Sequence, residues 1–179
     1  MLPGTIKVRQ MPTDRIHVNP DHIAYRKGVG VMILNHEGKV WVGQRQDSDQ
    51  LIGPNTWQMP QGGIDSTETP WQAALREMKE EIGTVNVRLI QESRGWISYD
   101  FPEELHKILW GGRFYGQTQK WFLVEFLGED SEININTRHP EFCAWQWVDA
   151  SELPNLIVSF KRKLYITLLE EFKEHLKTA

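Results

Sequence analysis

Residues 62–84 constrain the fold and the chemistry of this chain more than any other segment. Glu77, Glu80 and Glu81 stand at positions i, i+3 and i+4, so on a helix their side chains share one face. Like charges at this spacing repel one another, and an ordinary surface helix gains nothing from holding them together. A divalent cation reverses the sign of the interaction, because carboxylate oxygens are the ligands that Mg²⁺ and Mn²⁺ prefer. The spacing therefore predicts a helix that carries a metal site.

The flanking residues predict where this helix begins and ends. Thr69 is a good N-cap, Pro70 suits the first helical position, and Gln72 completes a capping box. Gly83 stands where a glycine ends many helices. Ala73 is expected beside the glutamates, where its small side chain would leave room for a cation. A separate apolar stripe is expected to face the core, and it consists of Trp71, Ala74, Leu75, Met78 and Ile82.

A solvated acidic face is the usual explanation for a run of helical glutamates. It accounts for the three carboxylates, but it does not account for the fixed distances of four other residues from them. These four are Gly62, Glu68, Arg76 and Gly83. The whole set resembles the Nudix box, the signature of hydrolases that cleave a diphosphate linked to another moiety. The resemblance favours a functional site over a surface helix.

Phrases outside the box resemble two related groups within this family. These groups are the bacterial RNA pyrophosphohydrolases and the diadenosine tetraphosphate hydrolases of bacteria and plants. The phrases occur at 25–26, 56–65, 116–122, 140–142, 145–148 and 158–161. The resemblance implies an α/β Nudix fold, in which a mixed β-sheet is sandwiched between α-helices. It also implies attack by water on phosphorus within a polyphosphate, with Mg²⁺ as cofactor and Mn²⁺ or another divalent cation as a substitute.

The same resemblance implies roles for the acidic residues and their neighbours. A further glutamate, Glu141, is expected to bind metal together with the three box glutamates, and it is a candidate to activate the attacking water. Arg76 is expected to pair with a box carboxylate and orient it. Glu68 is expected to support this network or to touch a metal directly. A turn at Gln61 and Gly62 is expected to bring main-chain groups near the phosphates, because glycine allows close approach.

Six residues are candidates for binding the substrate. By resemblance, two arginines and a glutamine are expected to contact phosphates, and a phenylalanine and a lysine are expected to stack on and contact a base. A tyrosine is a candidate for the wall of the same cleft. Taken alone, either arginine would be an ordinary surface residue and the phenylalanine a core residue, so both interpretations stay open. The residues are Arg26, Arg45, Gln117, Phe160, Lys161 and Tyr99.

The rest of the chain predicts one domain at residues 22–179 that follows an irregular lead-in at 1–21. Ser159 is expected to cap a last amphipathic helix, in which Leu164, Leu168, Phe172 and Leu176 recur at four-residue steps. Residues 46–55 and 100–118 are expected to be loops. Strands are expected at 29–34, 39–44, 85–91, 95–99, 120–126 and 142–148.

Composition limits the classes of function. The net charge of −4 and the pI near 5.9 argue against broad, salt-driven binding along nucleic acid, although they allow recognition of a single phosphorylated end. Cys143 is the only cysteine, which suits a reducing compartment, and we expect a buried structural thiol. No signal peptide and no membrane span are expected, so the predicted location is the cytoplasm.

Three functions follow from these observations. The leading hypothesis is a hydrolase that removes pyrophosphate from the 5′-triphosphate end of RNA, cleaves dinucleoside polyphosphates, or does both. The alternative enzyme is a nucleotide-sanitising or ADP-ribose-type Nudix hydrolase, against which the phrases at 116–122 and 158–161 argue. A non-catalytic binding module of the same fold would be expected to lose box glutamates, whereas this chain keeps all three.

Overall fold

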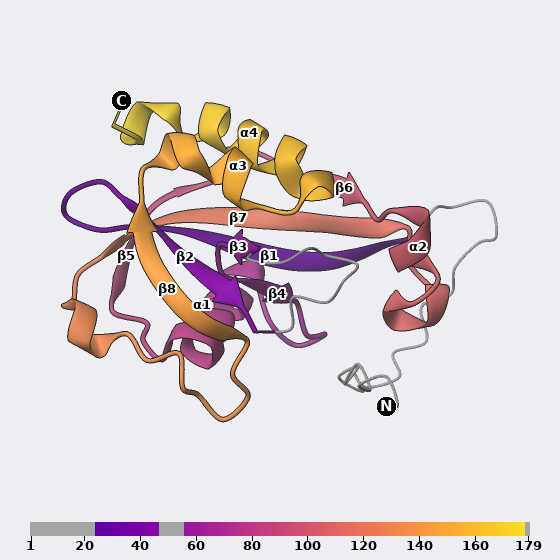
Figure 1. Cartoon of the computed structure of the whole chain (residues 1–179), viewed down its shortest axis with the longest axis horizontal. Coiled ribbons are helices and arrows are strands. Elements are labelled where there is room, and N and C mark those ends of the chain that lie inside the picture. The colour runs from indigo at the N-terminus through magenta and orange to yellow at the C-terminus, as the bar shows by residue number, and fades with distance from the viewer. Residues whose placement is uncertain (1–23, 47–55, 178–179) are drawn as a thin grey trace.

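A computed structural model describes residues 24–46 and 56–177. The predicted lead-in at 1–21 and nearly all of the predicted loop at 46–55 lie outside these residues. Figure 1 shows helices above and below a central sheet. The predicted α/β architecture, a mixed sheet between helices, is confirmed.

Two long parallel strands form the centre of the sheet. Strand β1 (Tyr25–Leu34) pairs with β7 (Gly116–Phe126) along its whole length, from Tyr25↔Gly116 to Leu34↔Glu125. The main path runs β3-β2-β1-β7-β5, while β4 pairs with β1, β6 with β7 and β8 with β2, all antiparallel. The other strands are β2 (Val40–Arg45), β3 (Trp57–Gln58), β4 (Gln61–Gly63), β5 (Val87–Glu92), β6 (Ile97–Asp100) and β8 (Phe142–Val148).

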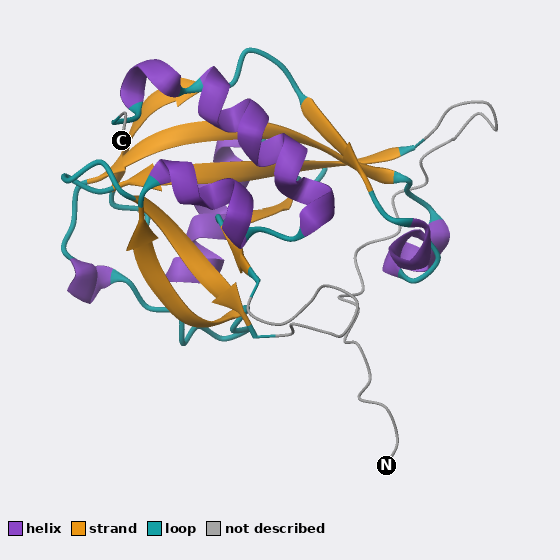
Figure 2. Ribbon diagram, turned by 45° about the horizontal axis from the view of Figure 1, so that its top comes forward, coloured by secondary structure: helices purple, strands orange, loops and turns teal. Residues whose placement is uncertain are grey.

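Helices cover both faces of the sheet. Helix α1 (Pro70–Ile82) packs on one face, and α3 (Leu153–Leu156) and α4 (Arg162–Glu171) pack on the other (Figure 2). Successive side chains of β1 point to opposite faces of the sheet, so Val31 packs in the core under α1 and Met32 packs in the core under α4. The short helices are α2 (Glu103–His106), η1 (Leu109–Gly112), η2 (Asp130–Glu132), η3 (Ala150–Glu152), η4 (Ser159–Lys161) and η5 (Lys173–His175).

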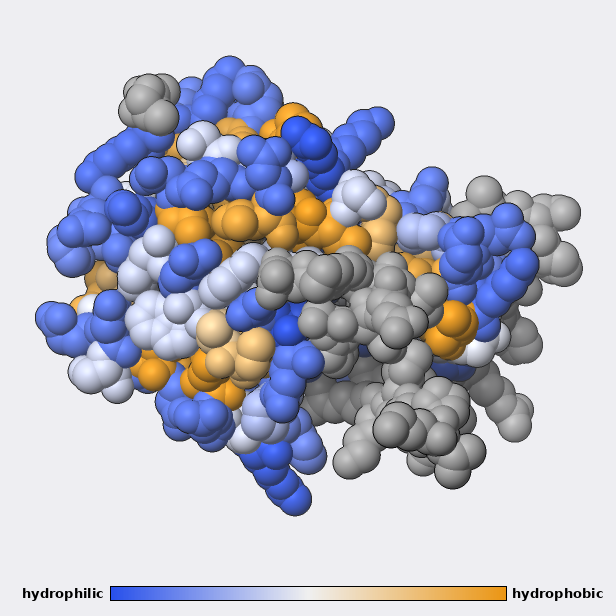
Figure 3. All heavy atoms as spheres, viewed as in Figure 1, coloured by the Kyte–Doolittle hydropathy of each residue, from blue (hydrophilic) through white to orange (hydrophobic). Residues whose placement is uncertain are grey.

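The surface follows from this layering. On the face shown in Figure 3, hydrophilic residues cover most of the outline, and hydrophobic residues surface in a band between the helices α3 and α4 and the sheet. None of the helices formed by the described residues is long and apolar enough to cross a membrane.

Both predicted ends of α1 are confirmed, whereas the predicted position of Ala73 beside an open acidic face is not. Thr69 caps α1 in a complete capping box with Gln72, and Gly83 ends the helix in the left-handed conformation. Ala73, however, is fully buried in the core under α1. Ala73 therefore belongs to the core and does not lie on an open acidic face.

Three predictions about local structure are wrong. Residues 100–118 are not one long loop, because they include the end of β6, the short helices α2 and η1, and the start of β7; the first residues of β7 are polar and hid the strand. Gln61 and Gly62 lie in strand β4 and not in a turn. Ser159 lies in η4 and makes no cap, since α4 begins only at Arg162. The apolar face of α4 is confirmed, with Leu164, Leu168 and Phe172 buried.

Cys143 is exposed and not buried. The pairing of β2 with β8 shifts at this point, so that Gln44 faces Ala144 and Arg45 faces Phe142. Cys143 is thus the extra residue of a β-bulge, which turns its side chain away from the core. The apolar neighbours in sequence did not reveal this shift.

Candidate active site

Strand β4 and helix α1 bring the box residues together. Gly62 lies directly against the carboxylate of Glu77: a Cβ added at Gly62 would be 1.9 Å from Cδ of Glu77. The main-chain N–H of Gln61 donates to Oε2 of Glu81 at 3.2 Å. The glycine is therefore needed for close packing of a carboxylate on the strand. Glu77 and Glu81 are both buried.

Arg76 connects the acidic residues of the box. Its Nη1 donates to Oε1 of Glu77 at 2.7 Å, its Nε donates to Oε1 of Glu68 at 2.7 Å, and its Nη2 donates to the carbonyl of Gly63 at 2.8 Å. Oε2 of Glu80 lies 3.5 Å from Nη1. The guanidinium fixes the orientation of Glu77 and neutralises part of the charge of the cluster.

The negative charges of the two buried glutamates, Glu77 and Glu81, are only partly compensated by nearby cations. Burial raises the pKa of Glu77 to about 7, in spite of Arg76, and Glu80 and Glu141 act in the same direction. Burial also raises the pKa of Glu81 well above its ordinary value, and the carboxylates of Glu141 and Glu77 add to the effect. Oε1 of Glu81 is buried, and no donor among the described residues reaches it. Its charge is therefore not neutralised by a donor, and the Glu141 carboxylate is a close neighbour of the Glu81 side chain.

Glu141 approaches from a different part of the chain. It immediately precedes β8, and its carbonyl accepts a hydrogen bond from the N–H of Gln46 at 2.9 Å. The next residue, Phe142, pairs with Arg45 of β2. The influence of Glu141 on the pKa values of Glu77 and Glu81 places its carboxylate beside theirs. The fold thus gathers four predicted acidic residues in one region.

The donor set suits a hard divalent cation. Carboxylate oxygens are the preferred ligands of Mg²⁺ and Mn²⁺, and the buried Oε1 of Glu81, which no donor among the described residues reaches, is such an oxygen. Within 24–46 and 56–177, no three acidic, imidazole or thiol side chains already converge as a closed ligand set. Arg76 draws Glu77 and Glu80 toward itself, so binding of an ion requires these side chains to adjust.

The raised pKa of Glu77 predicts how stability depends on pH without metal. Between its ordinary value of 4.5 and about 7, the folded protein binds the proton more tightly than the unfolded chain. The free energy of unfolding is therefore expected to fall as pH rises through this window, by about 3 kcal/mol. Thermal melting in chelator at pH 5 and pH 8 measures the effect. Glu77→Gln should reduce the dependence without removing it, because the raised pKa of Glu81 acts in the same direction, and an unchanged slope in that variant would refute the assignment.

Three predicted substrate residues lie side by side across the sheet. Arg26 of β1 pairs with Gln117 of β7, and Gln117 pairs with Tyr99 of β6. Gln117 and Tyr99 are buried. Nε2 of Gln119 donates to Oε1 of Gln117 at 3.0 Å and lies 3.2 Å from Oε1 of Gln61. These amides connect the row to β4 and the box.

Lys161 and Phe160 lie at the start of α4, near Tyr99. Lys161 is buried, with its Nζ 5.4 Å from the centre of the Tyr99 ring. Burial lowers the pKa of Lys161 to about 7, and Arg45 lowers it further, whereas Glu81 and Glu141 oppose the shift. Lys161 therefore faces the carboxylates. Phe160 is half-buried, packs against the core, and has its ring 6.1 Å from that of Tyr99.

Sequence reasoning missed Gln61 and Gln119 as side chains that connect the site. Polar residues that alternate within a strand were the available signal, since the GQTQ phrase places Gln117 and Gln119 on one face. It also missed Trp110, whose ring lies 4.8 Å from Cζ of Arg26. No periodic pattern marks a single aromatic residue in a short helical segment.

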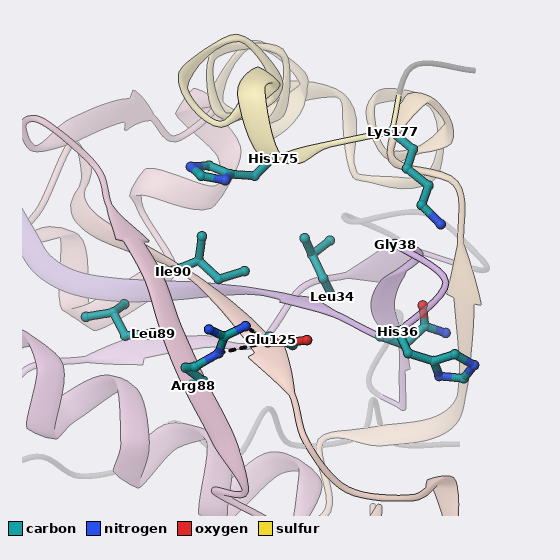
Figure 4. Close-up of a pocket in the computed structure, with 10 residues that line it drawn as sticks. Leu34, His36, Gly38, Arg88, Leu89, Ile90, Glu125, His175 and Lys177 are labelled. Carbon is teal, nitrogen blue, oxygen red and sulfur yellow. Dashed lines mark hydrogen bonds and ion pairs between the residues drawn. The ribbon is translucent and has the colours of Figure 1, made fainter.

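A pocket of about 440 Å³ lies at the other ends of β1 and β7. Figure 4 shows Arg88, Glu125, His175 and Lys177 around it. Its charged groups bind one another or the main chain, because Arg88 pairs with Glu125 and Lys177 donates to the carbonyl of Glu37. None of the predicted site residues lines this pocket. Arg26 and Gln117, two of the predicted residues, lie toward the opposite ends of β1 and β7.

Comparison with known proteins identifies the family. The model of the NUDIX domain matches residues 24–168. An RNA pyrophosphohydrolase of Rhodospirillum rubrum is 55% identical over 149 residues, which cover 83% of this chain and 87% of that protein. An RNA pyrophosphohydrolase of Roseobacter denitrificans is 48% identical over 165 residues, covering 89% of this chain and 100% of that protein.

Solved structures show the same fold at low sequence identity. The E. coli dihydroneopterin triphosphate pyrophosphohydrolase matches with a TM-score of 0.60 and 24% identity, covering 80% of this chain and 95% of that one. A C. elegans Ap4A hydrolase binary complex matches with a TM-score of 0.57 and 16% identity, covering 82% and 98%. The architecture is common to all three proteins.

Proposed function

The chain belongs to the NUDIX domain family, whose hydrolases act on phosphoric anhydride bonds, and from that premise we propose that it removes pyrophosphate from the 5′-triphosphate end of RNA. Two RNA pyrophosphohydrolases share about half of its residues over most of both chains. The observation that carries the proposal is the cluster of carboxylates around Glu77 and Glu81, which are buried without enough positive charge.

A divalent cation at this cluster would stabilise negative charge on the attacked phosphate and make water a better nucleophile. We propose Mg²⁺, with Mn²⁺ as a substitute, and we assign its binding to Glu77, Glu80, Glu81 and Glu141. Arg76 holds Glu77 in place and takes support from Glu68 and the carbonyl of Gly63. We assign to Glu141 the acceptance of the proton from the attacking water.

The substrate is expected to enter along the row formed by Arg26, Gln117 and Tyr99. Arg26 and Arg45 supply fixed positive charge for the phosphates, and Gln117 supplies a polar amide. Phe160, whose ring lies 6.1 Å from that of Tyr99, offers an aromatic face to a base. Because Lys161 is buried beside the carboxylates, we assign it to the phosphate chain in place of the predicted base contact.

Dinucleoside polyphosphates are the alternative substrates, since they too present a nucleoside followed by a polyphosphate. Both substrates are best compared side by side, with triphosphorylated RNA and diadenosine tetraphosphate at equal concentration and Mg²⁺ present. The proposal predicts pyrophosphate release and a 5′-monophosphate on the RNA, with a higher kcat/KM for RNA. Turnover of diadenosine tetraphosphate without conversion of the RNA end would contradict it.

Phe160 offers a test of the base-binding end. The ring is only half-buried, so Phe160→Ala is expected to cost less stability than the roughly 3–5 kcal/mol typical of a fully buried phenylalanine. Loss of stacking is expected to raise KM for RNA, in line with about 1–3 kcal/mol per base. Steady-state kinetics and thermal melting measure both effects. Phe172→Ala, at a fully buried position, is the core control. A large drop in melting temperature with unchanged KM would make Phe160 structural.

A further inference from the structure

Arg26 is a cation held near the box with little to neutralise it. Its guanidinium packs on Gly63, where an added Cβ would lie 2.1 Å from Nη2. Glu77 is the strongest attractive charge acting on it, but no carboxylate in the described part of the chain forms an ion pair with it. A desolvated charge without a paired anion is costly. Its retention beside Glu77 indicates a place kept for an anionic ligand.

The indole of Trp110 lies next to this guanidinium. Cζ of Arg26 is 4.8 Å from the centre of the ring, within the range of a cation–π contact, and tryptophan gives the strongest such contact. Two aromatic neighbours determine the orientation of the indole. Phe101 stacks on it at 5.5 Å with an interplanar angle of 26°, and Phe114 meets it edge-on at 6.4 Å.

The backbone at Trp110 is in an unfavourable conformation. Its φ of 47° is the only positive value at a non-glycine residue in the described ranges, and Gly111 and Gly112 follow with φ of 65° and 73°. Nε of Arg113 donates to the carbonyl of Trp110 at 3.1 Å and helps to hold this turn. Glycine would suit the position better. A bulky residue kept in a strained conformation beside an active site points to a role for its side chain.

We propose that Trp110 is a positioning residue, whose ring holds the guanidinium of Arg26 beside the box carboxylates so that it meets the phosphates of the substrate. The proposal rests on the proposed function, in which Arg26 contacts phosphates. A flexible arginine loses rotational freedom when it binds an anion, and prior immobilisation by the indole reduces that loss. The competing explanation is that Trp110 only packs the segment between β6 and β7.

Trp110→Gly removes the indole ring but keeps the backbone conformation of the turn, so it tests the two contributions separately. Glycine adopts positive φ without strain, which offsets part of the packing lost with Phe101 and Phe114, while kcat/KM for triphosphorylated RNA falls about tenfold, mainly through KM. Trp96→Ala is the matched control, because it deletes another indole that carries a cation, Lys27, at 5.5 Å, and it should leave kcat/KM unchanged. Full activity of Trp110→Gly would overturn the proposal.

A second pair of variants keeps the backbone strain constant. Trp110→Phe retains an aromatic face and should preserve most of the activity, whereas Trp110→Leu retains apolar volume without a π-system and should lose about as much as the glycine variant. If the leucine variant is as active as the phenylalanine variant, the residue acts by packing alone and the proposal fails. This comparison holds even if the glycine variant is poorly folded.

A double-mutant cycle with Arg26→Ala tests whether the ring acts through the arginine. The proposal predicts that Trp110→Gly causes no further loss once Arg26 is alanine, whereas the same tenfold loss in both backgrounds would overturn it. The cycle is measured on triphosphorylated RNA and on diadenosine tetraphosphate. If the wild type hydrolyses only the latter, the RNA assignment fails, yet the cycle on diadenosine tetraphosphate still decides the role of Trp110.

Discussion

Glu81→Gln is expected to lower turnover by about three orders of magnitude while the protein remains folded. The substitution removes the charge of a proposed metal ligand, and metal stabilisation of a transferring phosphoryl group is worth several kcal/mol. The fold should not suffer, because Glu81 is a buried carboxylate whose pKa is raised by burial and by Glu141. A glutamine keeps an acceptor for the N–H of Gln61. The melting temperature without metal should therefore stay the same or rise.

Single-turnover rates and thermal melting, both measured with and without Mg²⁺, provide the test. Glu174→Gln makes the same chemical change at an exposed position on η5 and should leave both quantities unchanged. Addition of Mg²⁺ should raise the melting temperature of the wild type, and it should do so less for Glu81→Gln. Turnover of this variant within a few-fold of the wild type would remove Glu81 from the ligand set.

Gly62→Ala is expected to lower turnover by about a hundredfold through a steric effect on Glu77. The added Cβ would lie 1.9 Å from Cδ of Glu77, so the carboxylate must move and its 2.7 Å hydrogen bond with Arg76 must break or lengthen. Displacement of a catalytic group by about 1 Å can cost that much in rate. The loss in free energy of unfolding should be smaller than the rise in activation free energy, because the long side chain of Glu77 can turn away from the added methyl group.

Gly95→Ala is the matched control for this substitution, since nothing lies within 4 Å of a Cβ added there. It should change neither the rate nor the melting temperature. Kinetics over a range of Mg²⁺ concentrations should show a weaker apparent metal affinity for Gly62→Ala than for the control. Equal rates and equal metal dependence in the two variants would show that the position of Glu77 is unimportant for turnover.

The sequence predicted the parts of the fold that depend on local signals. The cap at Thr69 and the left-handed Gly83 are properties of a few adjacent residues, and the structure confirms both. The layering of α1 and α4 against the sheet follows from periodic apolar residues, which the sequence displays directly. The predicted strand at 142–148 likewise has the bounds of β8.

The failures have a common physical origin in long-range contacts. Cys143 is exposed because β2 and β8 pair with a bulge, and register between distant strands leaves no mark in the apolar run around the cysteine. The start of β7 was missed because its polar amides, which hydrogen-bond to each other, break the usual apolar alternation. Ala73 joins the core because the burial of a small residue depends on what packs against it.

In the site, too, the features set by local sequence could be predicted, and those set by long-range contacts could not. The spacing of Glu77, Glu80 and Glu81 on one helix was sufficient to predict an acidic cluster, and family resemblance placed Glu141 with it. The contacts of Gly62 with Glu77 and of Trp110 with Arg26 join segments that are far apart in the chain. Only the three-dimensional arrangement reveals them.

The central claim is that a divalent cation at the buried box carboxylates lets this chain hydrolyse the triphosphate end of RNA. The most direct measurement follows pyrophosphate release and the state of the RNA 5′ end for the wild type and Glu81→Gln, in Mg²⁺ and in excess chelator. The account predicts conversion to a 5′-monophosphate by the wild type in Mg²⁺, and almost none in chelator or by the variant. Full conversion by the wild type in chelator, or by Glu81→Gln in Mg²⁺, would contradict it.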